Sequence, residues 1–281
     1  MPALMEVPPA IAHLFSLFPL HTFPAIKPQS GAPPRVPTLW IQPPSSTLRL
    51  STDVECLKWQ AYLALRGVTK IALRYDVAPE GAKGARLPNL HLADGELHPA
   101  QLIPTWVDEV LGESERPLEG YKDQAALDES RAWVSLLEGD VHAALIMAQP
   151  SPSYLWSLLS FPITPSRPLE SILSPPPPPL SGLSTVFPIF GTRLSPKHVE
   201  SKYCDAISTI ADRLGTDKWF LGSSDPTPLD ALVFAYLHSI LHNANHIVRT
   251  EVTRRVNLVA WELRVRGIVS GAFTRPEEAV L

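Results

Sequence analysis

Positive charge and cysteine are both scarce in this sequence of 281 residues. Lysine and arginine together number 24 against 28 acidic residues, which gives a formal net charge of −4. A nucleic-acid-binding domain usually carries a basic excess, so no nucleic-acid partner is expected. The two cysteines, Cys56 and Cys204, each lie in a predicted helix. We expect both thiols to be reduced and buried, as in a protein that faces the cytosol.

The sequence also lacks a targeting peptide and a membrane-spanning segment. Its first ten residues contain Glu6 and three prolines, and its first arginine is Arg35, which fits neither a secretory signal nor a matrix-targeting helix. The longest uncharged stretches are 171–192, with six prolines, and 231–248, with three histidines. A spanning helix needs about 20 mostly apolar residues. We therefore expect neither a transmembrane helix nor a C-terminal anchor.

Motifs for common catalytic chemistries are missing as well. There is no glycine-rich phosphate loop, no spaced pair of catalytic carboxylates and no zinc-ribbon set of cysteines. His238, His242 and His246 recur at intervals of four, a spacing at which two histidines of one helix can bind zinc. Because no cysteine or carboxylate cluster supports such a site, a polar stripe on a core helix is the favoured interpretation. The sequence thus predicts no metal and no cofactor.

Proline is abundant, with 31 residues, of which 11 lie in residues 1–50 and 11 in residues 149–192. The first concentration marks an N-terminal extension, residues 1–37, whose apolar burst is either a short surface-packed helix or a docking element for a partner or a bilayer surface. The second marks an apolar insertion, residues 149–192, with only two charges. The insertion either packs back on the helices or contacts a partner. The candidate partner- or membrane-contact residues in the two segments are Leu14, Phe15, Phe18, Tyr154, Trp156, Leu159, Phe161, Phe187 and Phe190.

Residues 38–112 show the element order of a thioredoxin-like α/β domain. The pattern predicts strands at 38–42, 69–75, 87–92 and 96–97, and helices at 52–66 and 99–111. Thr52 and Glu55 have the spacing of a capping box, so we expect Thr52 to cap the first helix.

Residues 120–270 read as an all-helical domain, interrupted by the insertion. Apolar spacing predicts helices at 124–147, 196–214 and 246–269, and a core helix that begins at Pro228. The last helix has a basic face, which is either solvated or lies against acidic lipid headgroups or an acidic partner. The arginines of this face are Arg249, Arg254, Arg255, Arg264 and Arg266.

The start of the core helix is the most specific local pattern. Thr227 is a suitable N-cap, and Asp230 three residues later can close a capping box. From Phe220 to Leu237 the chain reads F-x-G-x-x-x-P-T-x-L-D-A-L-V-F-x-Y-L. This pattern resembles the C-terminal helical domain of glutathione-transferase-fold proteins, and its Leu-Asp-Ala-Leu-Val-Phe run is similar to that of the metaxins. The resemblance implies a glutathione-transferase-like architecture, in which a thioredoxin-like α/β domain precedes an all-α domain.

The same resemblance implies a cis-proline at Pro88 and a function. Metaxins are non-catalytic subunits of the sorting and assembly machinery (SAM complex) of the mitochondrial outer membrane, and they assist insertion of β-barrel precursor proteins from the cytosolic side. The expected partners are the β-barrel core subunit, a sister metaxin and β-barrel precursors. The chain resembles the peripheral type of subunit in fungi, which lies at the outer-membrane surface without a transmembrane helix.

Two alternatives remain: a glutathione-dependent enzyme and a soluble scaffold of transferase fold elsewhere in the cytosol. An enzyme of this fold activates a thiol with a residue just after the first strand, where Ser45 and Ser46 are available. It also needs an acid–serine pair before the next helix to hold the γ-glutamyl carboxylate. At that place the sequence has Glu96-Leu97-His98-Pro99, which offers no hydroxyl. We therefore interpret the glutathione site as broken and the protein as not an enzyme.

Overall fold

This computed structural model describes residues 34–44, 49–77, 81–112, 117–149 and 195–273, all within one compact unit, Pro33–Leu281. The nine candidate contact residues of the N-terminal extension and the insertion lie outside the described residues, as do Ser45 and Ser46. The predicted domain boundaries at 112 and 120 stay predictions, since they adjoin residues 113–116, which are not described.

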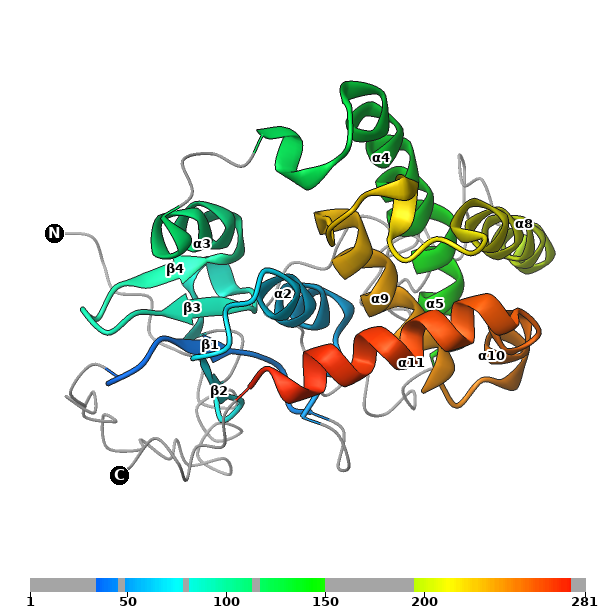
Figure 1. Cartoon of the computed structure of the whole chain (residues 1–281). Coiled ribbons are helices and arrows are strands. Elements are labelled where there is room, and N and C mark those ends of the chain that lie inside the picture. Colours follow the sequence, from blue (N-terminus) through cyan, green and yellow to red (C-terminus); the bar gives the residue numbers. More distant parts are fainter. Residues whose placement is uncertain (1–33, 45–48, 78–80, 113–116, 150–194, 274–281) are drawn as a thin grey trace, which may run out of the picture. The chain divides into compact units, whose positions relative to one another are not determined.

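A small mixed sheet forms the N-terminal part (Figure 1). Its strands are β1 (Thr38–Trp40), β2 (Ala72–Arg74), β3 (Asn89–His91) and β4 (Leu97–Pro99), in the order β2-β1-β3-β4. β1 pairs with β2 in parallel, and the β1–β3 and β3–β4 pairs are antiparallel. The register places Leu39 of β1 opposite Leu90 of β3, and both side chains are fully buried. The predicted thioredoxin-like arrangement is confirmed.

Helix α2 (Val54–Leu65) follows β1 and begins two residues later than the sequence predicts. Asp53, not Thr52, is its N-cap, because the Asp53 carboxylate accepts the Cys56 N–H at 2.9 Å. The Thr52 hydroxyl instead donates to the Pro43 carbonyl at 3.3 Å. Thr52 and Asp53 are both residue types that cap helices. Because the Thr52 hydroxyl bonds to Pro43, Asp53 is the one that caps α2.

The helix predicted at 99–111 is also shorter than expected. Pro99 belongs to β4, residues Ala100–Leu102 form a 3-10 turn, and α3 runs from Ile103 to Leu111. Pro104 lies in the first turn of α3, where a missing N–H breaks no helical hydrogen bond.

The helical part surrounds α9 (Pro228–Leu241), nearly all of whose side chains are buried. α9 packs against α2, α4 (Gln124–Leu136), α10 (His246–Thr253) and α11 (Val256–Gly271). The predicted helix at 124–147 is continuous but contains a π-helical turn, Leu137–Val141, before α5 (His142–Ala148). α8 (Pro196–Leu214) packs on that turn and on α5, with the predicted stripe Val199, Tyr203, Ile207, Ile210 and Leu214 buried.

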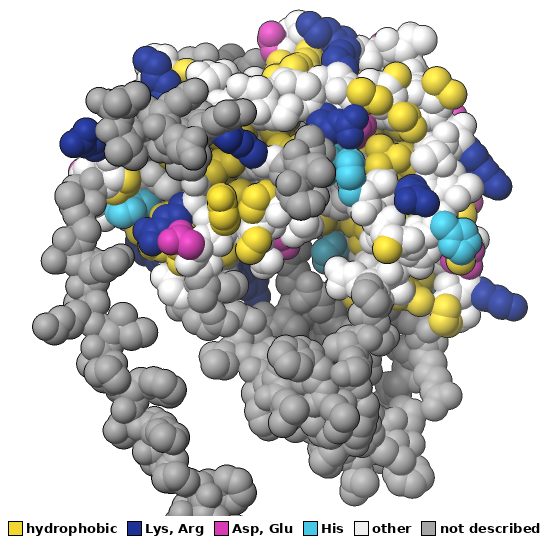
Figure 2. Space-filling model, turned by 90° about the horizontal axis from the view of Figure 1, so that it is seen from below, with side chains coloured by type: hydrophobic (Ala, Val, Ile, Leu, Met, Phe, Trp, Pro, Cys, Tyr) yellow, Lys and Arg dark blue, Asp and Glu magenta, His cyan; other side chains and the backbone are white. Residues whose placement is uncertain are grey.

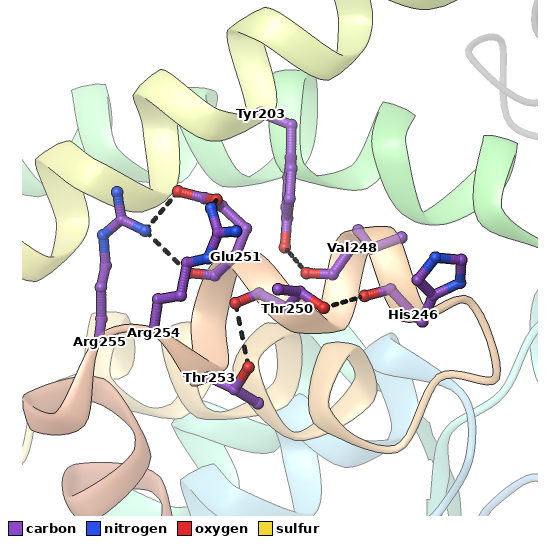
Figure 3. A network of polar contacts seen from close by, with 8 residues as sticks. All are labelled: Tyr203, His246, Val248, Thr250, Glu251, Thr253, Arg254 and Arg255. Atoms are coloured by element: carbon purple, nitrogen blue, oxygen red, sulfur yellow. Dashed lines mark hydrogen bonds and ion pairs between the residues drawn. The ribbon is translucent and has the colours of Figure 1, made fainter.

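The last helix is not single, as the sequence predicts, but breaks between α10 and α11. Arg255 has an extended backbone (φ −105°, ψ 93°). The hydroxyls of Thr250 and Thr253 donate to main-chain carbonyls of α10, a local competition that favours ending a helix (Figure 3). Glu251 pairs with Arg254 and Arg255 at the break, and Tyr203 of α8 donates to the Val248 carbonyl at 2.6 Å (Figure 3). The predicted basic face is therefore divided between two helices, and part of it is paired with Glu251.

Candidate functional site

The approach to α3 is where a transferase of this fold would hold the glutathione carboxylate. The sequence predicts this carboxylate-binding site at Glu96–Pro99. Because Leu97–Pro99 belong to strand β4, the residues directly before α3 lie further along the chain. The residues that directly precede α3 are Ala100, Gln101 and Leu102, and none carries a carboxylate or a hydroxyl. Leu102, the N-cap of α3, makes no side-chain capping hydrogen bond. Gln101 offers its side-chain amide as a donor, whereas Pro104 in the first turn of α3 removes one backbone N–H that could bind an anion.

Cys56 is the thiol nearest to the end of β1, and sequence reasoning did not weigh it as a nucleophile. It lies in the first turn of α2, fully buried, and its Sγ accepts the Gln42 N–H at 3.5 Å. Burial raises the pKa of the Cys56 thiol far above its usual value, and the negative charge of Asp53 adds to the rise. A catalytic cysteine needs the opposite, a lowered pKa and access to substrate. Cys204 is only half-buried, contrary to the expectation that both thiols are buried.

We predict that Cys56 resists alkylation in the native protein. Iodoacetamide at pH 8, followed by peptide mass spectrometry, is expected to modify Cys56 at least about a hundredfold more slowly than in urea-unfolded protein, since the thiolate is both scarce and inaccessible. Cys204 of the same sample is the internal control for accessibility. Native labelling of Cys56 at the unfolded rate would contradict this placement.

Pro88, Thr227 and Asp230, which the sequence predicts to have structural roles, have those roles in the structure. The Leu87–Pro88 peptide bond is cis, and Pro88 is buried directly before β3. Thr227 and Asp230 form the predicted capping box at the start of α9. The Asp230 carboxylate accepts the Thr227 N–H at 2.8 Å and the Phe220 N–H at 2.9 Å, so it joins the preceding turn to the helix. This motif organises the fold and touches no candidate substrate site.

The histidine triplet is not brought together as a metal site in the described part of the chain. His238 is buried on α9, and its Nδ1 lies 2.7 Å from the Glu262 carboxylate of α11. His242 stacks on His238 at 4.1 Å and contacts the His238 carbonyl, whereas His246 begins α10. Among the described residues no group of three potential ligands is close enough to hold a metal ion. Glu262, which the sequence analysis did not single out, is the partner that explains the buried His238.

A cleft of about 450 Å³ opens between α2, α3, α4 and the start of α9. This volume lies within the range of small-molecule sites. Its lining combines aromatic side chains, aliphatic side chains of α4 and α9, and charged side chains. The lining residues that carry the argument are Lys58, Trp59, Tyr62, Arg66, Tyr121 and Arg131.

The polar groups inside the cleft are engaged with one another. Arg66 donates to Asp108 at 2.9 Å and to the Tyr62 hydroxyl at 3.2 Å, so its charge is largely compensated. Burial raises the pKa of Tyr62, and the Arg66 charge offsets part of that rise. The Tyr121 hydroxyl accepts the Leu229 N–H of α9 at 3.2 Å, which ties the start of α9 to the segment before α4. Such an arrangement can bind an apolar group but presents no activated acid, base or nucleophile.

Comparison with known proteins identifies the helical part. A family model described as "Glutathione S-transferase, C-terminal domain" matches residues 203–265, which extend from α8 through α9 and α10 into α11. The fold is glutathione-transferase-like. The match covers α9, α10 and parts of α8 and α11, whereas α2 and α4, which also pack on α9, lie outside it; the small mixed sheet with its two helices supplies the thioredoxin-like part.

Solved structures similar to the chain include several glutathione transferases. One is a transferase from Methylobacterium radiotolerans in complex with glutathione sulfonate, 16% identical, covering 85% of this chain and 95% of its own, with a TM-score of 0.48. Another is glutathione transferase F7 from Populus trichocarpa, 10% identical, covering 84% and 99%, with a TM-score of 0.47. A beta-etherase from Sphingobium is 14% identical, covers 87% and 98%, and has a TM-score of 0.49. No curated protein matches the chain.

Within the described residues, none of the helices combines the length and the apolar character that a bilayer crossing requires.

Proposed function

We propose that this protein of glutathione-transferase-like fold is a non-catalytic binding subunit of the mitochondrial sorting and assembly machinery. It acts at the cytosolic face of the outer membrane, as the resemblance of its Phe220–Leu237 stretch to the metaxins implies. Its partners are the β-barrel core subunit, a sister metaxin and β-barrel precursors. The observation that carries the non-catalytic part is the approach to α3, where Ala100, Gln101 and Leu102 provide neither the carboxylate nor the hydroxyl of an acid–serine pair.

The interdomain cleft supports a binding role. Its aromatic and aliphatic lining suits an apolar side chain of a partner. Lys58 and Arg131, which pair with Glu55 at 3.7 Å and with Asp128 at 3.0 Å, are the basic side chains of this lining that an acidic group of the partner would meet. We propose that a partner segment occupies this cleft, in addition to the contacts predicted for the N-terminal extension and the insertion.

The test is purification of the tagged protein from gently solubilised mitochondria, with mass spectrometry of the bound proteins. Recovery of an outer-membrane β-barrel protein together with a second metaxin is the expected result. The Lys58→Glu, Arg131→Glu double variant is expected to recover several-fold less of one partner, whereas Lys197→Glu, Lys202→Glu on exposed α8 is the charge-matched control. A protein found only in the soluble fraction, with neither partner, would refute the assignment.

Glutathione-dependent catalysis is the second candidate, because the matched family model describes a transferase domain. Titration calorimetry with glutathione and turnover of a model electrophile test it directly. Under our proposal neither binding nor turnover is measurable. Turnover that disappears in the Ser45→Ala, Ser46→Ala variant would favour the enzyme instead.

A further inference from the structure

Helix α11 is apolar on two opposite sides, although only one side packs on the protein. Its inner side buries Leu258, Trp261, Val265 and Val269. On its outer side Val256 is 78% exposed and Leu263 is 54% exposed. Val256, Ala260, Leu263 and Gly267 recur at intervals of four, three and four, so they share one face of the helix. We call these four residues the outer stripe.

An exposed apolar stripe on a helix is uncommon without a function. Contiguous apolar surface that stays exposed often marks a place where a protein contacts a partner or a membrane. Ile268 is also 42% exposed, but it lies beyond Arg264 on the helical wheel and does not belong to the stripe. We therefore treat the outer stripe as a candidate interaction surface.

The charged residues of α11 on either side of the outer stripe are both positive. Arg264 and Arg266 flank it on the helical wheel. Arg264 is held in place, because it stacks on the Trp219 ring at 5.1 Å and donates to the Lys218 carbonyl. Within residues 242–273 there are five arginines and two glutamates, and both glutamates are engaged: Glu251 with Arg254 and Arg255, and Glu262 with His238 and, at 3.9 Å, with Arg266.

The exposed charged residues of 246–271 are all arginines, namely Arg249, Arg254 and Arg264, of which Arg254 pairs with Glu251 at 3.7 Å. The chain as a whole carries a net charge of −4, so this is a local basic surface on an acidic protein. Figure 2 shows one face of the molecule on which hydrophobic and basic side chains are interspersed and acidic ones are few. Such a surface is complementary to an anionic one.

We infer that the outer stripe of α11 docks on the surface of an anionic lipid bilayer. Aliphatic side chains flanked by arginine are typical of a helix that lies in the bilayer interface, where arginine stems cover apolar surface and their heads meet phosphate. A protein partner is less well matched, since protein interfaces depend on aromatic and methionine anchors, and the stripe has neither. That the bilayer is the mitochondrial outer membrane rests on the proposed function, whereas lipid binding by itself does not.

Co-sedimentation of the purified full chain with vesicles tests the inference. Vesicles of an equal mixture of phosphatidylcholine and phosphatidylserine are expected to bind the protein at least about tenfold more tightly than vesicles of phosphatidylcholine alone, and added salt is expected to weaken that binding. Val256→Glu with Leu263→Glu is expected to lower binding to the anionic vesicles about tenfold.

The charge-matched control is Val110→Glu with Leu111→Glu on α3, two apolar residues outside the stripe that are 55% and 37% exposed. It is expected to bind like the wild type, and circular dichroism establishes that all variants are folded. Equal binding to neutral vesicles, no binding to either kind, or the same loss in the control would overturn the inference. If the wild type binds no vesicles but captures an acidic protein that the Val256→Glu, Leu263→Glu variant does not capture, the stripe is a site for a protein partner instead. None of these outcomes depends on the mitochondrial purification, so the two proposals fail separately.

Discussion

Replacing Asp230 by alanine is expected to lower the free energy of unfolding by about 3–5 kcal/mol, because it leaves several buried donors without an acceptor. The Asp230 carboxylate is fully buried and accepts the Thr227 N–H, the Phe220 N–H and the Thr227 hydroxyl, the last at 2.7 Å. The first two bonds join the start of α9 to the turn Phe220–Gly222. Urea unfolding followed by circular dichroism measures the effect.

The turn itself explains why the loss is large. Leu221, in its middle, is buried with a left-handed backbone (φ 60°), a conformation that costs a non-glycine residue about 1 kcal/mol or more. Phe220 packs edge-on against Trp261 of α11 at 5.4 Å. Without Asp230 the Phe220 N–H loses its partner, and the packing of α11 is expected to loosen as well. Thr227→Ser, which keeps a hydroxyl at the N-cap, is the matched control and is expected to lose less than about 1 kcal/mol. A loss below about 1 kcal/mol in Asp230→Ala would contradict this account.

Asp230 also predicts a dependence of stability on pH. Burial raises the pKa of its carboxyl to about 6, although the hydrogen bonds from Phe220 and Thr227 oppose the rise. The unfolded value is about 3.9, so between pH 4 and 6 the folded state binds more protons than the unfolded state. The contribution of Asp230 to stability therefore decreases by up to about 3 kcal/mol as the pH rises through this window, and is constant above it. The difference in unfolding free energy between the wild type and Asp230→Asn isolates the effect, and a difference that grows with pH would contradict it.

Glu262→Ala is the second substitution with a large expected effect, a loss of about 3 kcal/mol or more. Glu262 is almost fully buried on α11, and its partner His238 is buried on α9, so the pair links the two helices across the core. Removal of the carboxylate leaves the imidazole without its hydrogen-bond acceptor and creates a cavity. Glu262→Gln keeps an acceptor of the same shape and is the control, with an expected loss of less than half that of the alanine variant.

The His238–Glu262 pair also predicts that stability decreases in acid, which an apolar contact at the same place would not cause. Burial lowers the pKa of His238, and the hydrogen bond that the imidazole donates to Glu262 opposes that shift. Because an unfolded histidine titrates near pH 6.5, the unfolded state binds more protons below that pH and stability falls as the solution is acidified. Without Glu262 the pKa of His238 falls further, so Glu262→Ala is expected to lose more stability than the wild type between pH 6.5 and 5. Chemical unfolding at the two pH values measures this, and parallel losses would show that His238 is not the titrating group.

The path from sequence to fold was reliable where a local signal and the tertiary structure agree. The capping box at Thr227 and Asp230 predicted the start of α9 correctly, because cap and helix lie within four residues of each other. The apolar stripe of α8 and the order of strands and helices in the thioredoxin-like part were predicted from periodicity alone. The fold class followed from these patterns and from the resemblance that they carry.

Predictions failed where two local signals competed or where a distant contact intervened. Thr52 and Asp53 are both good N-caps, and the bond of Thr52 to Pro43 left the role to Asp53. The break between α10 and α11 could not be predicted, because no proline or glycine lies there in the sequence. It depends on hydroxyl–carbonyl bonds inside α10 and on Asn257, which donates to the Ala211 carbonyl of α8 at 2.8 Å.

The sequence by itself determined the fold class of this protein, the position of its core helix and the absence of familiar catalytic motifs, because each depends on residues that are close along the chain. Only the tertiary structure decided that His238 pairs with Glu262, that four helices enclose a cleft, and that the apolar residues of α11 divide into a buried and an exposed face. The pair and the cleft join residues that are distant in sequence, and an apolar residue has the same sequence signal whether it faces the core or the solvent.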